Sequence, residues 1–260
     1  MTFVSELQPH GLWRHFDRLL TIPRGSKHEA QAREYVLSIA SAAELAALED
    51  GAGNVVVRKP ATAGREAAAS VVLQAHLDMV QEKNTGTDHD FATDPIRPLR
   101  DDAWLSADGT TLGADNGIGV AAMLAIMEAD DLEHGPLEFL YTVDEETGLT
   151  GAKELSTDFL ESRLLINLES EEDGVITIGC AGGGDTRVYV PLVRGGIEAG
   201  AGLAVSVSGL KGGHSGVDIH LQRGNAISIL ARALRSAADS HDLRIVELSG
   251  GNARNAIPRE

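Results

Sequence analysis

The stretch Val71-Val-Leu-Gln-Ala-His-Leu-Asp78 places a run of apolar residues directly before an imidazole and a carboxylate. A short, β-branched apolar run bounded by polar residues predicts a buried strand over residues 70–75. His76 and Asp78 then lie two residues apart at the end of this strand, so their side chains point to the same side. In such a pair, one side chain can bind a metal ion while the other forms a hydrogen bond with it and sets its orientation.

Polar clusters of the same kind accompany two more predicted strands and one predicted helix. They are Asp144-Glu145-Glu146 after residues 137–143, Glu169-Ser170-Glu171 after residues 164–168, and Asp115 in the loop before residues 116–128. In open α/β sheets, ligands bind outside the carboxyl ends of the strands, so we expect these clusters to converge. One acidic cluster alone is usually a solvated loop, but the four together predict a metal site.

The donors available to this site are imidazole and carboxylate groups. The single cysteine, Cys180, excludes a disulfide framework and a cysteine-based zinc site, and we expect it to be buried. Imidazole combined with carboxylates suits zinc, manganese or cobalt. Glu145 and Glu146 are adjacent, so in an extended backbone their side chains diverge. One of them can then bind metal while the other faces the substrate as a base.

The remaining pattern predicts an α/β domain followed by a small α+β domain. Strands alternate with helices over residues 50–180, which favours a largely parallel sheet. A capping box formed by Ser26 and Glu29 is expected to open the second helix. The expected helices are 8–20, 26–47, 151–155 and 224–238, the other expected strands are 54–57, 175–179, 187–193, 203–207 and 242–248, residues 81–114 form a loop, and Gly182-Gly-Gly184 forms a hinge.

Composition excludes several classes of function. The 260 residues carry a net charge of −17, which gives nucleic-acid binding almost no electrostatic basis and disfavours an acidic membrane surface. Residues 1–13 lack the basic and apolar regions of a signal peptide. The longest apolar stretch, residues 117–127, is shorter than the ~18 residues that a membrane span requires. A cytosolic protein is expected.

Four motifs, in this order, resemble those of the co-catalytic zinc exopeptidases and aminoacylases. They are His76-Leu-Asp78, Gly113-Ala-Asp-Asn-Gly117, Asp144-Glu-Glu-Thr-Gly148 and Asn167-Leu-Glu-Ser-Glu171. Two longer stretches, residues 75–84 and 211–220, are similar to the aminoacyl-histidine (Xaa-His) dipeptidases, which are cytosolic, carnosine-cleaving members of this superfamily. The resemblance implies a zinc-exopeptidase-like catalytic domain over residues 1–185, with a mixed sheet flanked by helices. Residues 186–260 would begin a smaller α+β lid domain, through which the family forms homodimers.

The resemblance also implies a set of metal ligands. Asp115 would bridge two divalent ions, with a cis peptide bond to Asn116. His76 and Glu169 would complete the first site, although the dipeptidases mostly carry Asp where this chain has Glu169. Glu146 would bind the second ion. The ions implied are zinc, with manganese or cobalt as alternatives.

Three further residues receive catalytic roles from the resemblance. Glu145 would be the general base of a peptide-bond hydrolysis carried out by a water molecule that two metal ions activate. Asp78 would orient His76, and His214 would polarise the substrate carbonyl or stabilise the oxyanion. His220 matches the dipeptidase motif without an assigned role. The other histidines, apart from His241, are expected to be solvated: His10, His15, His28, His89 and His134.

The sequence departs from the family at one position of the second metal site. The family supplies the last ligand from a histidine well beyond residue 260, whereas no histidine follows His241 in this chain. The second site therefore lacks its last ligand here, and the chain is expected to be truncated within the lid.

Three hypotheses remain open at this stage. The first is a dipeptidase acting on Xaa-His dipeptides. The second keeps the fold and chemistry but changes the substrate, as in an N-acyl amino acid deacylase, a tripeptidase or a carboxypeptidase. The third is a non-catalytic remnant that keeps the sheet and does not hold two metal ions.

Overall fold

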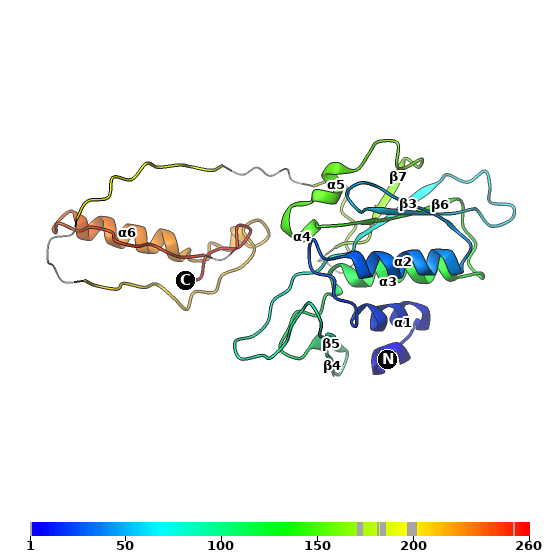
Figure 1. The fold of residues 1–260 in the computed structure, drawn as a ribbon, viewed down its shortest axis with the longest axis horizontal. Coiled ribbons are helices and arrows are strands. Elements are labelled where there is room, and N and C mark those ends of the chain that lie inside the picture. The colour runs from blue at the N-terminus through cyan, green and yellow to red at the C-terminus, as the bar shows by residue number, and fades with distance from the viewer. Residues whose placement is uncertain (1, 171–173, 181, 183–185, 197–201, 252) are drawn as a thin grey trace. The chain divides into compact units, whose positions relative to one another are not determined.

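The computed structural model describes residues 2–170, 174–180, 182, 186–196, 202–251 and 253–260. They form two compact units, Met1–Gly182 and Gly183–Glu260 (Figure 1). Glu171 and most of the predicted hinge lie outside the described residues. The assignment of the first unit as a catalytic domain and of the second as a lid remains a prediction.

The first unit is built on a five-stranded mixed sheet. The strand order is β1-β2-β6-β3-β7, in which β3 runs parallel to both β6 and β7, while β2 is antiparallel to β1 and β6. The strands are β1 (Ala46–Glu49), β2 (Val55–Lys59), β3 (Val71–His76), β6 (Leu137–Thr142) and β7 (Leu164–Asn167). The parallel core agrees with the predicted strand–helix alternation, and the two antiparallel strands make the sheet mixed.

Three helices pack together beside this sheet: α1 (His10–Leu19), α2 (Ala30–Ala42) and α3 (Ala114–Glu128) (Figure 1). The α3 helix contacts β3, and both α1 and α2 contact α3. Phe16, Val36, Leu124 and Phe139 are fully buried between these elements. Burial of such side chains contributes roughly 1.5–3 kcal/mol each and fixes the helices against the sheet. The predicted α/β class with a mixed sheet and flanking helices is confirmed.

Short elements complete the described residues of both units. They are the 3-10 helices η1 (Phe3–Glu6) and η2 (Ile219–Leu221), the strands β4 (Pro98–Asp101) and β5 (Trp104–Ala107), and the helices α4 (Glu145–Gly148), α5 (Thr150–Glu154) and α6 (Ala226–Ala238). Asn225 caps α6, because its side chain accepts a hydrogen bond from the amide of Ser228 at 3.0 Å. No described helix combines the length and the hydropathy needed to cross a membrane.

The prediction of one helix over residues 26–47 is wrong at both ends. The α2 helix begins at Ala30, and Ser26 does not cap it. Glu44 then adopts a left-handed conformation with φ 56°, and Ala46–Glu49 pairs with β2 as a strand. Ala, Leu and Glu favour helix intrinsically, but pairing with a neighbouring strand outweighs such small propensities.

The predicted loop 81–114 contains the β4–β5 hairpin, which the sequence analysis missed. Its strands have four residues each and pair only with one another. Leu99 and Trp104 are exposed, so burial does not impose on this segment the alternating pattern that reveals a strand.

The strands predicted at 175–179, 187–193, 203–207 and 242–248 are also wrong, since the structure assigns no strand to the described part of these segments. Their β-branched residues favour extended backbone, but a strand also requires a neighbour that completes its hydrogen bonds. Val188, Val205 and Ile245 are instead exposed.

Three side chains lie in environments opposite to those expected. His15 is fully buried, with its Nδ1 2.7 Å from the hydroxyl of Tyr35 and its Nε2 3.0 Å from the carboxylate of Glu128. His89 is buried beside Phe91. Cys180 is exposed as a free thiol. His15 lies three residues after Leu12 and four before Leu19, so it belongs to the apolar face of α1, which packs against α3.

Candidate metal centre

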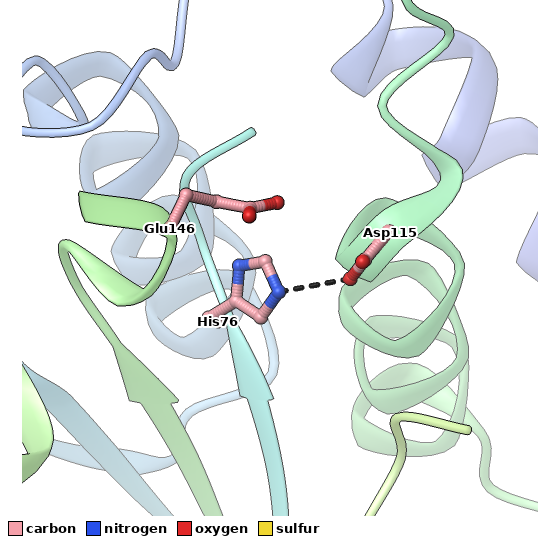
Figure 2. A group of neighbouring side chains, drawn as sticks. All are labelled: His76, Asp115 and Glu146. Atoms are coloured by element: carbon pink, nitrogen blue, oxygen red, sulfur yellow. Dashed lines mark hydrogen bonds and ion pairs between the residues drawn. The ribbon is translucent and has the colours of Figure 1, made fainter. Parts of the chain in front are cut away.

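The carboxyl ends of three neighbouring strands bring the candidate ligands together. His76 is the last residue of β3, which lies between β6 and β7 in the sheet. The acidic residues Glu145 and Glu146 follow β6, and Glu169 follows β7. Asp115 reaches the same place from the start of α3, and Figure 2 shows it facing His76, with the carboxylate of Glu146 beside the ring and directed towards Asp115.

His76 is the common member of two groups of candidate ligands. Its Nε2 lies 2.9 Å from Asp115 Oδ1 and 4.0 Å from the nearest carboxylate oxygens of Glu145 and Glu169. The first group is His76, Asp115 and Glu146, and the second is His76, Glu145 and Glu169, with the donor atoms of each group within 4.8 Å of one another. The four predicted metal ligands and the predicted base are thus adjacent.

Asp78 is fully buried and connects His76 to the acidic pair. Its Oδ1 lies 3.3 Å from Nδ1 of His76. The carboxylate also accepts hydrogen bonds from the backbone amides of Glu145, at 3.0 Å, and Glu146, at 3.1 Å, and from the hydroxyl of Ser26, at 2.7 Å. Burial alone would raise the pKa of Asp78, but the hydrogen bonds lower it to about 2. Asp78 therefore remains ionised and holds both His76 and the acidic turn.

Glu145 and Glu146 do not lie in the extended backbone that we expected. They open the one-turn helix α4, directly after Asp144, which is left-handed with φ 51° and ψ 48°. The side chain of Asp144 accepts hydrogen bonds from the hydroxyls of Thr147 and Thr150. The helical turn directs the amides of both glutamates towards the carboxylate of Asp78, and both side chains remain beside His76.

The start of α3 brings Asp115 to the site through an irregular backbone. Gly113 is left-handed with φ 72°, and the peptide bond between Asp115 and Asn116 is cis, as the family resemblance implies. The side chain of Asp115 is 62 % exposed, whereas Asn116 is buried. Asp115 is thus the most accessible of the donors around His76.

The electrostatics of the site favour binding of a divalent cation. Burial lowers the pKa of His76, but the hydrogen bond to Asp115 and the adjacent carboxylate of Asp78 outweigh it and raise the pKa to about 10. Burial, reinforced by the charge of Asp115, raises the pKa of Glu146 to about 7. Burial also raises the pKa of Glu145. The raised pKa values mean that these crowded groups retain protons when no cation balances the negative charge of the carboxylates. Imidazole with carboxylates also matches the donor preference of zinc or manganese.

The other predicted site residues lie in the second unit or outside the described residues. His214 is exposed, and its Nδ1 accepts hydrogen bonds from the amides of Gly216, at 3.1 Å, and Val217, at 3.0 Å. His220 and His241 are also exposed. The site roles of all these residues remain predictions.

Sequence reasoning missed Arg24, Ser26 and Glu29 as parts of this centre. All three side chains contact the segments that carry candidate ligands. Ser26 and Glu29 drew attention only as a helix cap. A buried arginine that binds backbone carbonyls leaves no pattern in a single sequence.

Three known proteins are similar to this chain. It is 48% identical over 261 residues to the cytosol non-specific dipeptidase of Escherichia coli (strain K12), with all of this chain and 54% of the relative covered. The crystal structure of the aminoacylhistidine dipeptidase of Vibrio alginolyticus matches with a TM-score of 0.70 and 45% identity, covering 99% of this chain and 53% of that one. The aminopeptidase PepT of Bacillus cereus matches at 22% identity and a TM-score of 0.53, over 96% of this chain and 63% of that one, which supports the fold alone.

The chain therefore spans about half the length of the first two proteins that it matches. The resemblance to the aminoacyl-histidine dipeptidases is confirmed by these two matches. The model of peptidase family M20/M25/M40 matches residues 72–250, a range that contains His76, Asp115, Glu145, Glu146 and Glu169. Since this range is more than half of the chain, the protein belongs to peptidase family M20/M25/M40.

Proposed function

We propose that the protein is a metal-dependent dipeptidase that hydrolyses Xaa-His dipeptides. The observation that carries this proposal is the convergence of one buried imidazole and four carboxylates at the strand ends of an M20 fold. The names of the Escherichia coli and Vibrio alginolyticus relatives both describe dipeptidases, which supports the substrate class. The match of residues 75–84 and 211–220 to the dipeptidase motifs favours histidine in the second position of the dipeptide.

The proposed ligand sets are those that the family resemblance implies, and all their members lie around His76. His76, Asp115 and Glu169 would hold one divalent ion, and Asp115 with Glu146 would hold a second. Zinc is the proposed metal, with manganese or cobalt as alternatives of similar donor preference. When bound, such a pair lowers the pKa of water and stabilises negative charge on the substrate carbonyl.

Glu145 is the proposed general base. Burial raises the pKa of Glu145, which brings a carboxylate closer to the range in which it both accepts and returns a proton near neutrality. Its amide is held by Asp78, so its backbone position is fixed relative to His76. Glu145 would take a proton from the attacking water and pass it to the departing amine.

His214 is the proposed donor to the substrate oxyanion. Its Nδ1 accepts two backbone hydrogen bonds, so the proton of the neutral ring resides on Nε2. The Nε2–H group is then available as a donor. Loss of one such donor typically costs ~10²–10³ in kcat, so His214→Ala is expected to lower kcat by this factor and to leave the metal content unchanged.

We further propose a homodimer formed through the second unit, and a cytosolic location. The family resemblance supports the first. The second rests on the name of the Escherichia coli relative.

Activity of the zinc-loaded protein on a substrate panel tests the proposal. The panel contains β-alanyl-histidine and other Xaa-His dipeptides, dipeptides without histidine, a tripeptide, a C-terminally extended peptide and an N-acetyl amino acid. We expect free histidine to be released fastest from the Xaa-His dipeptides, and its release to be slower by about 10²–10⁴-fold in Glu145→Gln. Preference for another class would assign the site to a non-specific dipeptidase, tripeptidase, carboxypeptidase or deacylase. Lack of activity on every compound would favour a non-catalytic protein.

A further inference from the structure

The loop between α1 and α2 contacts three segments that precede or carry candidate ligands. They are the end of β3, the loop before α3 and the turn after β6. We call residues 24–29 the bracing loop. Its three inward-facing polar side chains are Arg24, Ser26 and Glu29, of which Arg24 and Glu29 are buried. Together these side chains contact all three segments of the metal centre.

Arg24 connects the end of β3 to the loop before α3. Its Nη1 donates hydrogen bonds to the carbonyl oxygens of Leu77 and Asp78, both at 3.0 Å, and its Nη2 donates to the carbonyl of Gly113. A fixed guanidinium fork can satisfy two separate segments at once, which a flexible lysine does poorly. Arg24 therefore sets the spacing between the segments that carry His76 and Asp115.

Two glycines make room for this guanidinium. A Cβ atom at Gly113 would lie 2.5 Å from Nη2 of Arg24, and one at Gly117 would lie 2.7 Å from the same atom. Real Cβ atoms essentially never approach a neighbour this closely. The start of α3 thus accommodates the arginine at the point where it delivers Asp115 to the site.

Ser26 acts on the acidic turn through Asp78. Its hydroxyl donates a hydrogen bond of 2.7 Å to Oδ2 of Asp78, and the same oxygen accepts the amide of Glu146 at 3.1 Å. The other oxygen of Asp78 accepts the amide of Glu145. Ser26 therefore helps to fix the carboxylate that orients both glutamates.

Glu29 acts on the same turn directly. Its Oε1 accepts the amide of Asp144 at 3.0 Å and the amide of Lys27 at 2.8 Å. Asp144 is the left-handed residue immediately before Glu145. A left-handed conformation is unfavourable for a non-glycine residue, so the hydrogen bond from its buried amide to Glu29 helps to retain it.

We propose that Arg24, Ser26 and Glu29 are positioning residues, which hold three segments of the metal centre in register. This inference rests on the proposed function only in its catalytic consequence, because the contacts concern the metal ligands themselves. Four carboxylates around one imidazole repel one another, and a rigid frame is needed to keep them converged. The bracing loop supplies that frame from outside the strands that end at the site.

Glu29 provides the sharpest test, with Glu34 as a matched control. Glu34 is an exposed glutamate on the adjacent helix α2. Cobalt(II) is the probe, since its visible absorption reports on ligand geometry and its binding does not require turnover. The measurements are cobalt affinity, the cobalt spectrum, and kcat and KM for an Xaa-His dipeptide. Each is made on the parent protein, Glu29→Ala, Glu29→Gln and Glu34→Ala.

We expect Glu29→Ala to bind cobalt about 10–100-fold more weakly, with an altered spectrum, as is typical for loss of a residue that orients ligands. Its kcat should fall by a larger factor than its KM changes. Glu29→Gln keeps the accepting oxygen for both amides, so it should restore affinity, spectrum and kcat. Glu34→Ala should match the parent protein throughout.

Two results would overturn the inference: parent-like cobalt binding by Glu29→Ala, or no recovery in a folded Glu29→Gln. If Glu29→Ala fails to fold by circular dichroism, Ser26→Ala takes its place, and parent-like cobalt binding by that variant counts equally against the inference. A parent protein that lacks dipeptidase activity while Glu29→Ala still weakens cobalt binding would refute the proposed function and support the bracing role.

Discussion

His76 holds a proton that a bound cation would have to displace. Its pKa is raised to about 10, and that of Glu146 to about 7, so near neutral pH the metal-free protein carries a proton on the first and a partly protonated carboxyl group on the second. Metal ligands bind only when deprotonated, which makes affinity depend on pH. Each proton released makes the dissociation constant fall about tenfold per pH unit while pH stays below the pKa of that group.

We therefore expect zinc to bind more tightly as pH rises from 6 to 8, with a steeper change below pH 7, where both groups are protonated. Calorimetric titration in two buffers of different protonation enthalpy measures the protons released. Identical heats in the two buffers at pH 7 would show that neither proton is displaced, and would contradict the raised pKa of His76.

Substitution of Glu145 is expected to lower turnover, whereas substitution of the adjacent Glu146 is expected to weaken metal binding. General acid–base groups contribute typically ~10²–10⁴-fold to rate. Glu145→Gln should therefore retain bound metal and lose turnover by about that factor. Glu146→Gln should instead weaken binding of the second ion. Metal content by atomic absorption, measured beside kcat on the same samples, separates the two effects. Loss of metal from Glu145→Gln with retention in Glu146→Gln would reverse the assignment.

At the scale of elements, Asn54 joins the β1–β2 hairpin to the segment after β6. This fully buried side chain donates hydrogen bonds to Asp50, at 2.7 Å, and to the carbonyl of Gly151, at 2.9 Å, and it accepts the amide of Val143 at 3.2 Å. The antiparallel edge of the sheet and the turn that carries the acidic pair are thus held by one amide group.

Asn54→Ala is expected to lower the free energy of unfolding by about 2–4 kcal/mol, because each buried polar group left without a partner costs roughly 1–3 kcal/mol. Urea denaturation measures this loss. The control is Asn84→Ala, whose side chain is exposed and whose change should stay within about 0.5 kcal/mol. An equal, small effect of both variants would mean that Asn54 does not connect these elements energetically.

Elements were predictable from the sequence where periodicity and burial coincide. The strand that ends at His76 is apolar because α3 covers it, so its apolar pattern predicted a strand. Ala46–Glu49 gave no such signal, since it is mostly exposed and its residues favour helix. The helical turn at Glu145 was missed for another reason, because the amide acceptor that stabilises it, Asp78, lies far away in sequence.

At the scale of the whole molecule, the convergence of the site followed from one topological rule. Parallel neighbouring strands bring their carboxyl ends to one edge, so the sequence alone predicts that motifs as distant as His76 and Glu169 lie together. The residues that hold these motifs in place could not be predicted from the sequence. Arg24 binds main-chain carbonyls, and a carbonyl is present at every position, so nothing in the sequence marks its partners.

The two units differ in what they contribute to metal binding. All the candidate ligands of both groups belong to the first unit, Met1–Gly182, and both groups include His76. One ion can therefore take the imidazole, and a second ion is left with carboxylates alone among the described residues. Zinc prefers sites that include nitrogen or sulfur donors, so the two ions should bind with unequal affinity.

Calorimetric titration of the metal-stripped 260-residue chain with zinc is thus expected to show one strong binding event followed by a weaker one. His76→Ala should remove the strong event, because it removes the imidazole that both groups share. His241→Ala is the matched control, since it removes an exposed histidine of the second unit and should leave both events unchanged. Two equally tight events in the parent chain would require a nitrogen donor outside the described cluster or one donated by another chain.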